Sequence, residues 1–364
     1  DAAVAPAPGA VALAWPYRSR ADVVAAGRLA ADGWRVRVAT RGFTAAGRRF
    51  SPGSFVLRLS EQPDSLPRDP AGAAAAVARA GASAVALTRS GTDDGVDLGS
   101  DRVRALRHPR IAIAAGPAAS PTSFGAVRWL LEAEAGLPVD VVRLEDLGAA
   151  PGADRDSLAG RGSEGLDLGV YSAIVLPDGP GPDAWAAALG EGGARRLERW
   201  IEAGGTLVGV RAAAEWLTAD RSGISEVERA EPAEPDDDVR RTPRAEREAL
   251  RLRERIPGTI LAVDVDTTSA LGWGYDDGRA AVLVREPVEL ELAEEGNVWI
   301  YRDADPLSGY LPVGARERLA GAPWAIVEER GRGRIVLFAD DPAFRGIARG
   351  TEKAYLNAVL LVPE

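Results

Sequence analysis

Apolar and polar residues alternate along this chain in short segments that predict strands and helices in turn. Residues 34–39 (WRVRVA) and 54–59 (SFVLRL) repeat apolar residues with a period of two, which is typical of half-buried strands. Residues 21–31 and 71–80 carry apolar residues at helical spacing, and a glycine follows each segment closely. We therefore expect a small α/β unit or connector over residues 1–105.

A second, larger block of alternating strands and helices is expected from residue 106 to residue 364. Its clearest strand candidates are residues 110–115, 139–144, 171–176, 206–210 and 334–339. Strands that alternate with helices and are joined by glycine turns predict an α/β fold with a mostly parallel sheet flanked by helices. A highly charged segment from about residue 217 to 256 interrupts this pattern, and we interpret it as a solvated insertion.

Composition excludes several kinds of chemistry. The 364 residues contain one histidine, His108, and no cysteine. A Cys-His nucleophile pair, a thiolate-bound metal and a zinc site with two imidazoles are therefore excluded within this chain. The net charge of −10 disfavours nucleic acid as a partner, and no apolar run approaches the roughly 20 residues of a membrane helix. We expect a chain that is not an enzyme by itself and has no cofactor.

One polar loop, residues 91–101 (GTDDGVDLGSD), concentrates carboxylates. Its acidic residues are Asp93, Asp94, Asp97 and Asp101. Clustered carboxylate oxygens suit calcium, but this spacing is not that of an EF-hand and no glutamate closes the loop. We favour a solvated turn and expect no metal site, with calcium as the alternative.

The turns that follow the predicted strands form a candidate crevice, because ligands of parallel α/β sheets gather at the carboxyl ends of the strands. The residues at these ends are Gly116, Asp178, Gly179, Arg211, Asp340 and Asp341. Arg211 could clamp an anion or form a structural ion pair with Asp178 or Asp341, and we favour the ion pair. Adjacent carboxylates normally point in different directions, so we do not expect Asp340 and Asp341 to form a catalytic pair.

Other polar and aromatic residues allow structural interpretations. His108 lies just before the second block, where a hydrogen-bonded boundary residue is expected. Trp273 and Tyr275 could be core anchors or could line a saccharide- or peptide-binding groove, and the sequence leaves both open.

Several stretches together resemble a known family. Residues 171–179 (YSAIVLPDG) and 200–210 (WIEAGGTLVGV) resemble the strand–helix–strand core of the class I glutamine amidotransferase-like fold. Residues 331–361 look like the C-terminal part of such domains. That ending is familiar from bacterial secreted proteins whose N-terminal part is a carboxypeptidase A-like zinc peptidase. Residues 50–66 and 256–275 resemble further parts of the same proteins.

The resemblance implies a flavodoxin-like architecture. It also implies that this chain has lost the catalytic residues of the amidotransferases. In true amidotransferases, the strand that resembles residues 206–210 ends in a nucleophilic cysteine paired with a distant histidine. Here that position holds Arg211, which cannot act as a nucleophile, and no histidine lies near Asp341. The zinc ligands of the peptidase region are absent from this chain as well.

The resemblance therefore implies a non-catalytic accessory, binding or assembly region of a secreted zinc carboxypeptidase-like protein. It implies a secreted, periplasmic or cell-surface location. The partner would be a peptidase domain or another protein subunit, and an oligomer is possible. One alternative is a free-standing structural or interaction protein at the cell surface. The other is a carboxylate-dependent hydrolase centred on Asp178 and Asp341.

Overall fold

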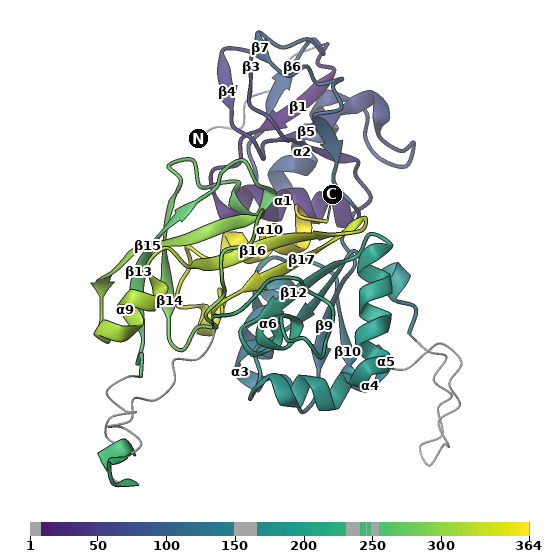
Figure 1. Ribbon diagram of the computed structural model, residues 1–364. Coiled ribbons are helices and arrows are strands. Elements are labelled where there is room, and N and C mark those ends of the chain that lie inside the picture. Colours follow the sequence, from purple (N-terminus) through teal and green to yellow (C-terminus); the bar gives the residue numbers. More distant parts are fainter. Residues whose placement is uncertain (1–8, 149–165, 231–240, 245, 249–254, 364) are drawn as a thin grey trace.

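The computed structural model describes residues 9–148, 166–230, 241–244, 246–248 and 255–363. These residues form a five-stranded, a nine-stranded and a three-stranded sheet (Figure 1). The five-stranded sheet lies at the top of Figure 1, and the nine-stranded sheet runs through the lower body of the molecule. The described helices pack on these sheets, so the chain has a mixed α/β fold, as the alternating pattern predicts.

The five-stranded sheet comes from the first hundred residues and is antiparallel throughout. Its order is β6-β1-β5-β2-β8. The strands are β1 (Ala12–Trp15), β2 (Val36–Ala39), β5 (Phe55–Arg58), β6 (Val85–Leu87) and β8 (Val103–Ala105). The small sheet beside it contains β3 (Phe43–Ala45), β4 (Arg48–Phe50) and β7 (Asp94–Gly95). The α-helices of this part are α1 (Arg20–Ala31) and α2 (Pro70–Ala80). A short 3-10 helix, η1 (Leu59–Glu61), lies between them in the chain.

The nine-stranded sheet has the order β10-β9-β11-β12-β17-β16-β15-β13-β14. The parallel half contains β9 (Ile111–Ala115), β10 (Val139–Arg143), β11 (Ala173–Leu176), β12 (Thr206–Val210) and β17 (Gly333–Phe338). The antiparallel half contains β13 (Thr259–Val265), β14 (Arg279–Val284), β15 (Asn297–Ser308) and β16 (Pro323–Arg330).

The expectation of a mostly parallel sheet is therefore not confirmed, because parallel pairing is confined to one half. The reason is visible between β16 and β17, where Gly331 and Arg332 alone join the two strands. A connection this short can only link antiparallel neighbours, whereas parallel neighbours need a long crossover. β17 thus ends the parallel half on one side and begins the antiparallel half on the other.

Helices follow the strands of the parallel half and pack against them. The segments are α3 (Pro121–Arg128), the π-helical η2 (Trp129–Glu134), α4 (Leu144–Gly148), η3 (Leu168–Val170), α5 (Pro182–Glu202) and α6 (Ala212–Leu217). The later segments are η4 (Ala270–Gly272), α9 (Val313–Leu319), η5 (Phe344–Gly346) and α10 (Glu352–Leu360). α10 contacts β11, β12 and α1, so the C-terminal helix joins the large sheet to the first part of the chain.

A buried polar network fixes this junction. The amide of Asn357, on α10, accepts a hydrogen bond of 2.6 Å from the Tyr17 hydroxyl and donates to the carbonyl oxygens of Leu271 and Trp273. Trp273 and Tyr275 are only 4% and 6% exposed. Tyr275 therefore fits the core-anchor interpretation, whereas Trp273 is buried and also lines the second cavity described below.

Three further expectations concern His108, the charged insertion and membrane-spanning helices. His108 lies between β8 and β9, and its Nδ1 is 2.9 Å from the carbonyl oxygen of Ala30, as expected for a boundary residue. Residues 231–240, 245 and 249–254 of the predicted insertion lie outside the described residues. Its first part is not a solvated loop, because Leu217, Ile224 and Val227 are buried. No helix in the described part of the chain is long and apolar enough to cross a bilayer.

Candidate functional site

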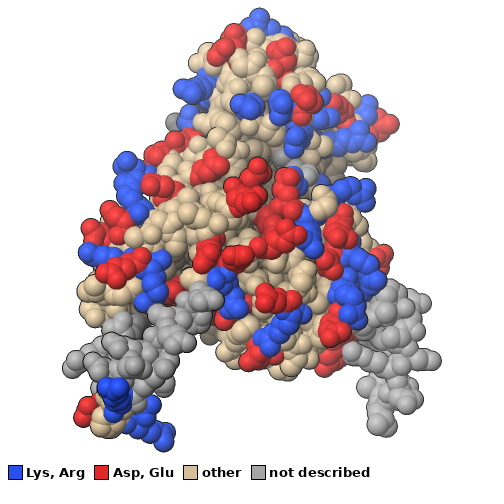
Figure 2. All heavy atoms as spheres, viewed as in Figure 1, with Lys and Arg blue, Asp and Glu red and all other residues tan. Residues whose placement is uncertain are grey.

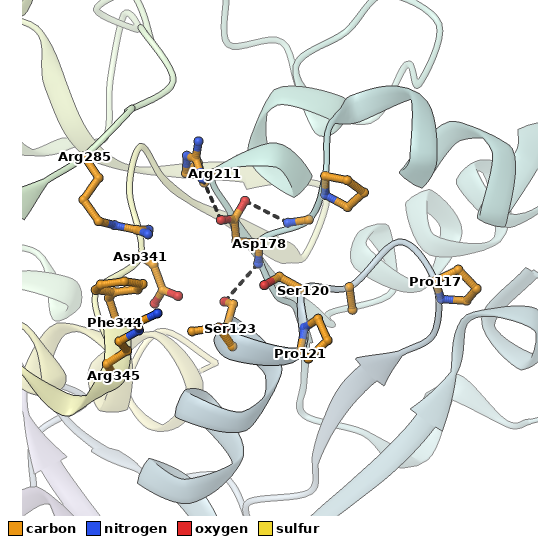
Figure 3. A pocket seen from close by; sticks show the side chains of 14 residues that line it. Pro117, Ser120, Pro121, Ser123, Asp178, Arg211, Arg285, Asp341, Phe344 and Arg345 are labelled. Atoms are coloured by element: carbon orange, nitrogen blue, oxygen red, sulfur yellow. Dashed lines mark hydrogen bonds and ion pairs between the residues drawn. The ribbon is translucent and has the colours of Figure 1, made fainter. Parts of the chain in front are cut away.

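A cavity of about 520 Å³ opens at the carboxyl ends of β9, β11, β12 and β17 (Figure 3). It is lined by Pro117, Ala119, Ser120, Pro121, Thr122, Ser123, Asp178, Gly179, Pro180, Arg211, Arg285, Asp341, Phe344 and Arg345. Four of the six predicted crevice residues are among them. The cavity thus lies where the strand ends of the parallel half predict a ligand site.

Arg211 occupies a tight strand-to-helix turn between β12 and α6. Its backbone has φ 47° and ψ −106°, in the left-handed region that non-glycine residues rarely adopt. Its N–H donates to the carbonyl oxygen of Phe338 at 2.9 Å, which ties the turn to the neighbouring strand β17. Such strained turns are characteristic of positions that present a nucleophile above a sheet, yet here the side chain is a guanidinium.

The Arg211 guanidinium is engaged by two carboxylates. Its Nη1 lies 2.9 Å from Oδ2 of Asp178, and its Nη2 lies 3.1 Å from Oε2 of Glu286. Its Nε also donates to the backbone carbonyl of Glu286 at 2.7 Å. Burial lowers the pKa of Arg211, but Asp178, Asp340 and Glu286 together hold that pKa above its ordinary value. Of the two ion-pair partners that the sequence predicts, Asp178 and Asp341, the structure shows Asp178, and it adds Glu286, which the sequence does not predict.

Asp178 is held in place by backbone amides as well as by Arg211. Its Oδ1 accepts hydrogen bonds from the N–H groups of Gly179, at 2.8 Å, and Ala212, at 3.3 Å. Its own N–H donates to the Ser123 hydroxyl at 3.1 Å (Figure 3). A carboxylate with this many partners is fixed in one orientation.

Asp340 and Asp341 point to different environments, as expected for adjacent residues. Asp340 is fully buried, does not line the cavity, and accepts hydrogen bonds from Arg285, at 2.6 Å from its N–H and 3.0 Å from Nη2. Asp341 lines the cavity and is 4% exposed. Its Oδ1 accepts the N–H of Ala343 at 2.9 Å, in the turn that follows β17.

The Asp341 carboxyl has an unusual protonation equilibrium. Burial raises its pKa to about 6, and the nearby charges of Asp340 and Asp178 act in the same direction. The Ser123 hydroxyl and the Ala343 amide oppose this shift only in part. Asp341 is therefore a buried carboxyl that takes up a proton within reach of neutral pH.

Two predicted residues do not belong to the cavity, and ten of its fourteen lining residues were not predicted. Gly116 and Asp340 are absent from the lining. The chain turns at Gly116, so that Pro117 lines the cavity instead, and the Asp340 carboxylate bonds to Arg285. Arg285, Phe344 and Arg345 are among the ten that were not predicted. The Arg285 guanidinium stacks 3.6 Å from the centre of the Phe344 ring. Arg285 follows β14 in the antiparallel half. The expectation that ligands gather at the carboxyl ends of parallel strands therefore does not predict its place in the cavity.

The calcium alternative for residues 91–101 finds no support. Asp93 forms an ion pair with Arg89, and Oδ1 of Asp97 accepts the N–H of Thr92 at 2.8 Å. Within the described ranges, no three histidine, cysteine or acidic residues gather in a way that could hold a metal ion. The expected solvated turn is only partly correct, because Asp94 and Gly95 form the short strand β7, which pairs with β3.

A second cavity, of about 1010 Å³, lies between the first part of the chain and the large sheet. One wall carries Arg41, Arg102 and Arg104. The opposite wall carries the acidic residues Glu226, Glu228, Glu294, Glu295, Glu328 and Glu329. Figure 2 shows acidic side chains gathered in the centre of this view, below the upper part of the molecule. This groove is polar and charged on both sides.

No family model and no curated protein matches the chain. Among solved structures, it is similar to an exo-β-1,4-mannosidase from Opitutaceae bacterium strain TAV5 (14% identity, TM-score 0.35, 69% of this chain and 36% of that chain). It is also similar to a putative ThuA-like protein from Parabacteroides merdae (14% identity, TM-score 0.39, 69% and 88%). A third match is a cytoplasmic protein from Salmonella typhimurium LT2 (12% identity, TM-score 0.41, 69% and 99%).

The chain thus spans about a third of the mannosidase and nearly all of the Salmonella protein. All three structures are less than 25% identical to it, and all three TM-scores lie below 0.5. Structures this distant assign no activity to this chain.

Proposed function

We propose that this chain is a non-catalytic binding and assembly region of a secreted zinc carboxypeptidase-like protein. Its parallel half would be a class I glutamine amidotransferase-like domain that has lost its nucleophile. One observation carries the proposal: Arg211 occupies the strained turn after β12 where that family places its cysteine, and two carboxylates engage its guanidinium. An arginine held in this way has no nucleophilic lone pair to offer.

The cavity beside Arg211 supports the binding part of this proposal. It retains the position of a ligand site, at the carboxyl ends of parallel strands, and it presents fixed polar groups. The charged groove between the two parts of the chain supports the assembly part, because such a surface favours a partner with a complementary charge pattern. The resemblance to secreted zinc carboxypeptidase-like proteins supports a secreted, periplasmic or cell-surface location as part of this proposal.

The first test of the assembly role is the intact mass of the native protein, with N-terminal peptide mapping and cross-linking. A native chain that extends into a His-x-x-Glu zinc sequence, or cross-links to a zinc peptidase at the groove residues, supports the accessory role. A native protein with neither connection contradicts it and leaves the free-standing interaction protein.

The non-catalytic part is tested by incubating the protein with glutamine and measuring ammonia. We expect no ammonia above a heat-denatured control. Ammonia release that is lost in Arg211→Ala would contradict the proposal.

A second candidate, a carboxylate-dependent hydrolase, is favoured by one observation. Asp178 and Asp341 line the same cavity, and the pKa of Asp341 is raised to about 6 by burial, which suits a general acid. Chromogenic glycosides and esters test this candidate. Turnover that is abolished in both Asp178→Asn and Asp341→Asn would establish it, and turnover that is absent or insensitive to these changes would exclude it.

A further inference from the structure

The cavity contains a buried carboxylate oxygen that makes no close hydrogen bond, although the Ser123 hydroxyl acts on its carboxyl group by lowering the pKa. Oδ2 of Asp341 has no hydrogen-bond partner among the described residues, although the residue is only 4% exposed. Figure 3 shows this carboxyl group pointing across the cavity toward Ser123. Buried polar atoms without partners are costly, and such an atom facing a cavity is suited to accept a hydrogen bond from a ligand.

The first turn of α3 forms the facing wall. The N-cap residue Ser120 makes no side-chain capping bond, and Pro121 has no N–H. The amides of Thr122 and Ser123 have no acceptor within the helix, because the first N–H groups of any helix lack one. Both residues line the cavity. Uncapped amides at a helix N-terminus favour an anionic group.

Arg345 adds a cationic group that is not already neutralised. It is exposed, lines the cavity, and has no ion pair with any described residue. Its guanidinium lies 5.1 Å from the centre of the Phe344 ring. The other two cavity arginines differ, since Arg211 pairs with Asp178 and Glu286, and Arg285 pairs with Asp340. Arg345 is therefore the guanidinium of this cavity that is free to meet a ligand.

We propose that this cavity binds a small hydroxylated oxyanion, an organic phosphate or carboxylate. Its anionic group would lie between Arg345 and the first turn of α3, and its hydroxyl group would donate to Oδ2 of Asp341. A volume of about 520 Å³ is ample for a molecule of this size. This inference rests on the proposed function in one respect, namely that the cavity binds its ligand without converting it.

Isothermal titration calorimetry with four probes tests the proposal. Glycerol 3-phosphate carries the anion and the hydroxyl, inorganic phosphate carries the anion alone, glycerol carries the hydroxyl alone, and D-glycerate replaces phosphate by carboxylate. We expect glycerol 3-phosphate or D-glycerate to bind at least fivefold more tightly than inorganic phosphate, and glycerol not to bind. Which of the two binds more tightly identifies the anionic group.

Two variants locate the binding groups, and a third serves as the control. Arg345→Gln should weaken every anionic probe at least tenfold, because it removes the unpaired guanidinium. Asp341→Asn should abolish the preference for the hydroxylated probe while phosphate still binds. Arg49→Gln, at an exposed arginine of β4 outside the cavity lining, should leave all affinities unchanged.

The proposal is overturned if wild-type protein binds none of the anionic probes at millimolar concentration, or if Arg345→Gln binds them as well as Arg49→Gln does. Product analysis of the same samples separates this inference from the proposed function. Binding with intact probe supports both. Binding with release of phosphate upholds the ligand class and contradicts the non-catalytic function. Failure to bind, together with cross-linking to a zinc peptidase, contradicts the ligand class alone.

Discussion

The Arg211 guanidinium lies 2.9 Å from the Asp178 carboxylate, although the two residues end different strands of the sheet. Asp178 follows β11, and Arg211 follows its parallel neighbour β12. The pair therefore joins two strand ends at the cavity, and it does so from a backbone conformation at Arg211 that costs on the order of 1–3 kcal/mol. The carboxylate contacts of Arg211 help to hold the residue in this strained turn.

Breaking this pair should destabilise the protein measurably. Arg211→Met leaves Asp178, which is 9% exposed at its side chain, without its charged partner. Two backbone amides still satisfy Oδ1 of Asp178, so we expect a loss of about 2 kcal/mol rather than the larger values seen for fully buried charges. Urea denaturation at pH 7.5 measures this loss.

A double-mutant cycle with Asp178→Asn isolates the pair. We expect a coupling free energy of about 1–2 kcal/mol. The matched control is the exposed pair of Arg302 and Asp264, whose side chains are 36% and 53% exposed, and whose coupling should stay below about 0.5 kcal/mol. Equal coupling in the two cycles would show that the Arg211 contact is an ordinary surface ion pair.

Asp341 should make the stability of the protein fall as the pH rises. Its pKa is about 6 when folded, because of burial, against about 3.9 in an unfolded chain. Below pH 4 both states are protonated and Asp341 imposes no penalty. Between pH 4 and pH 6 the unfolded state loses its proton first, so the folded state loses stability, by up to about 2–3 kcal/mol above pH 6.

Asp341→Asn removes this titration and keeps an oxygen for the Ala343 amide. Relative to wild type, the variant should gain stability progressively from pH 4 to pH 7, as measured by urea denaturation across that range. Asp264→Asn is the control of opposite sign, because the hydrogen bond from Arg302 lowers the pKa of Asp264. A stability difference between Asp341→Asn and wild type that does not change with pH would refute the prediction.

Sequence patterns located the parallel half of the sheet and much of the cavity. Apolar runs such as residues 171–176 and 206–210 are recognisable as buried strands, and polar residues directly after them must lie at one edge of a parallel sheet. Asp178 and Arg211 were found in this way, and their ion pair follows from that shared edge. For these strands and the residues that follow them, the local sequence is sufficient for the prediction.

The predictions that were wrong concern which strands pair with one another. The periodicity of apolar residues predicts a strand but does not predict its partner. β13 to β16 have strand patterns like the others, yet they run antiparallel, so the sheet is parallel only in one half. Arg285 reaches the cavity from this half through its pairing with Asp340. Which of Asp340 and Asp341 faces the cavity depends on how the chain turns after β17. These are tertiary contacts between segments far apart in sequence.

Asn357 should be one of the most sensitive positions outside the cavity. It is fully buried and satisfies the Tyr17 hydroxyl and two backbone carbonyls at once. Asn357→Leu leaves those groups without partners in a dry core, so we expect a loss of about 2–4 kcal/mol. Thermal unfolding followed by circular dichroism measures it.

Tyr17→Phe provides the comparison, because it removes one hydroxyl and leaves the two carbonyl bonds of Asn357 intact. Its loss should be about 1 kcal/mol. If Asn357→Leu costs no more than Tyr17→Phe, the bonds to Leu271 and Trp273 do not stabilise the junction between α10 and the loop after η4.

Gly179 permits the close approach of two loops that form the cavity. A Cβ at this position would overlap the carbonyl oxygen of Ala118 and lie 2.8 Å from Nε1 of Trp185. Because the first obstacle is backbone, it cannot move aside as a flexible side chain could. Gly179→Ala should therefore push the Ala118 loop away from Asp178 and cost about 1–3 kcal/mol. It should also abolish binding of glycerol 3-phosphate.

Gly99→Ala is the matched control, since a Cβ there meets nothing within 4 Å. This change should be neutral or slightly stabilising, because alanine restricts the unfolded chain more than glycine does. Urea denaturation and calorimetric titration of the two variants side by side check both expectations. If Gly179→Ala retained wild-type stability and ligand affinity, the contact between the Ala118 and Gly179 loops would not shape the cavity.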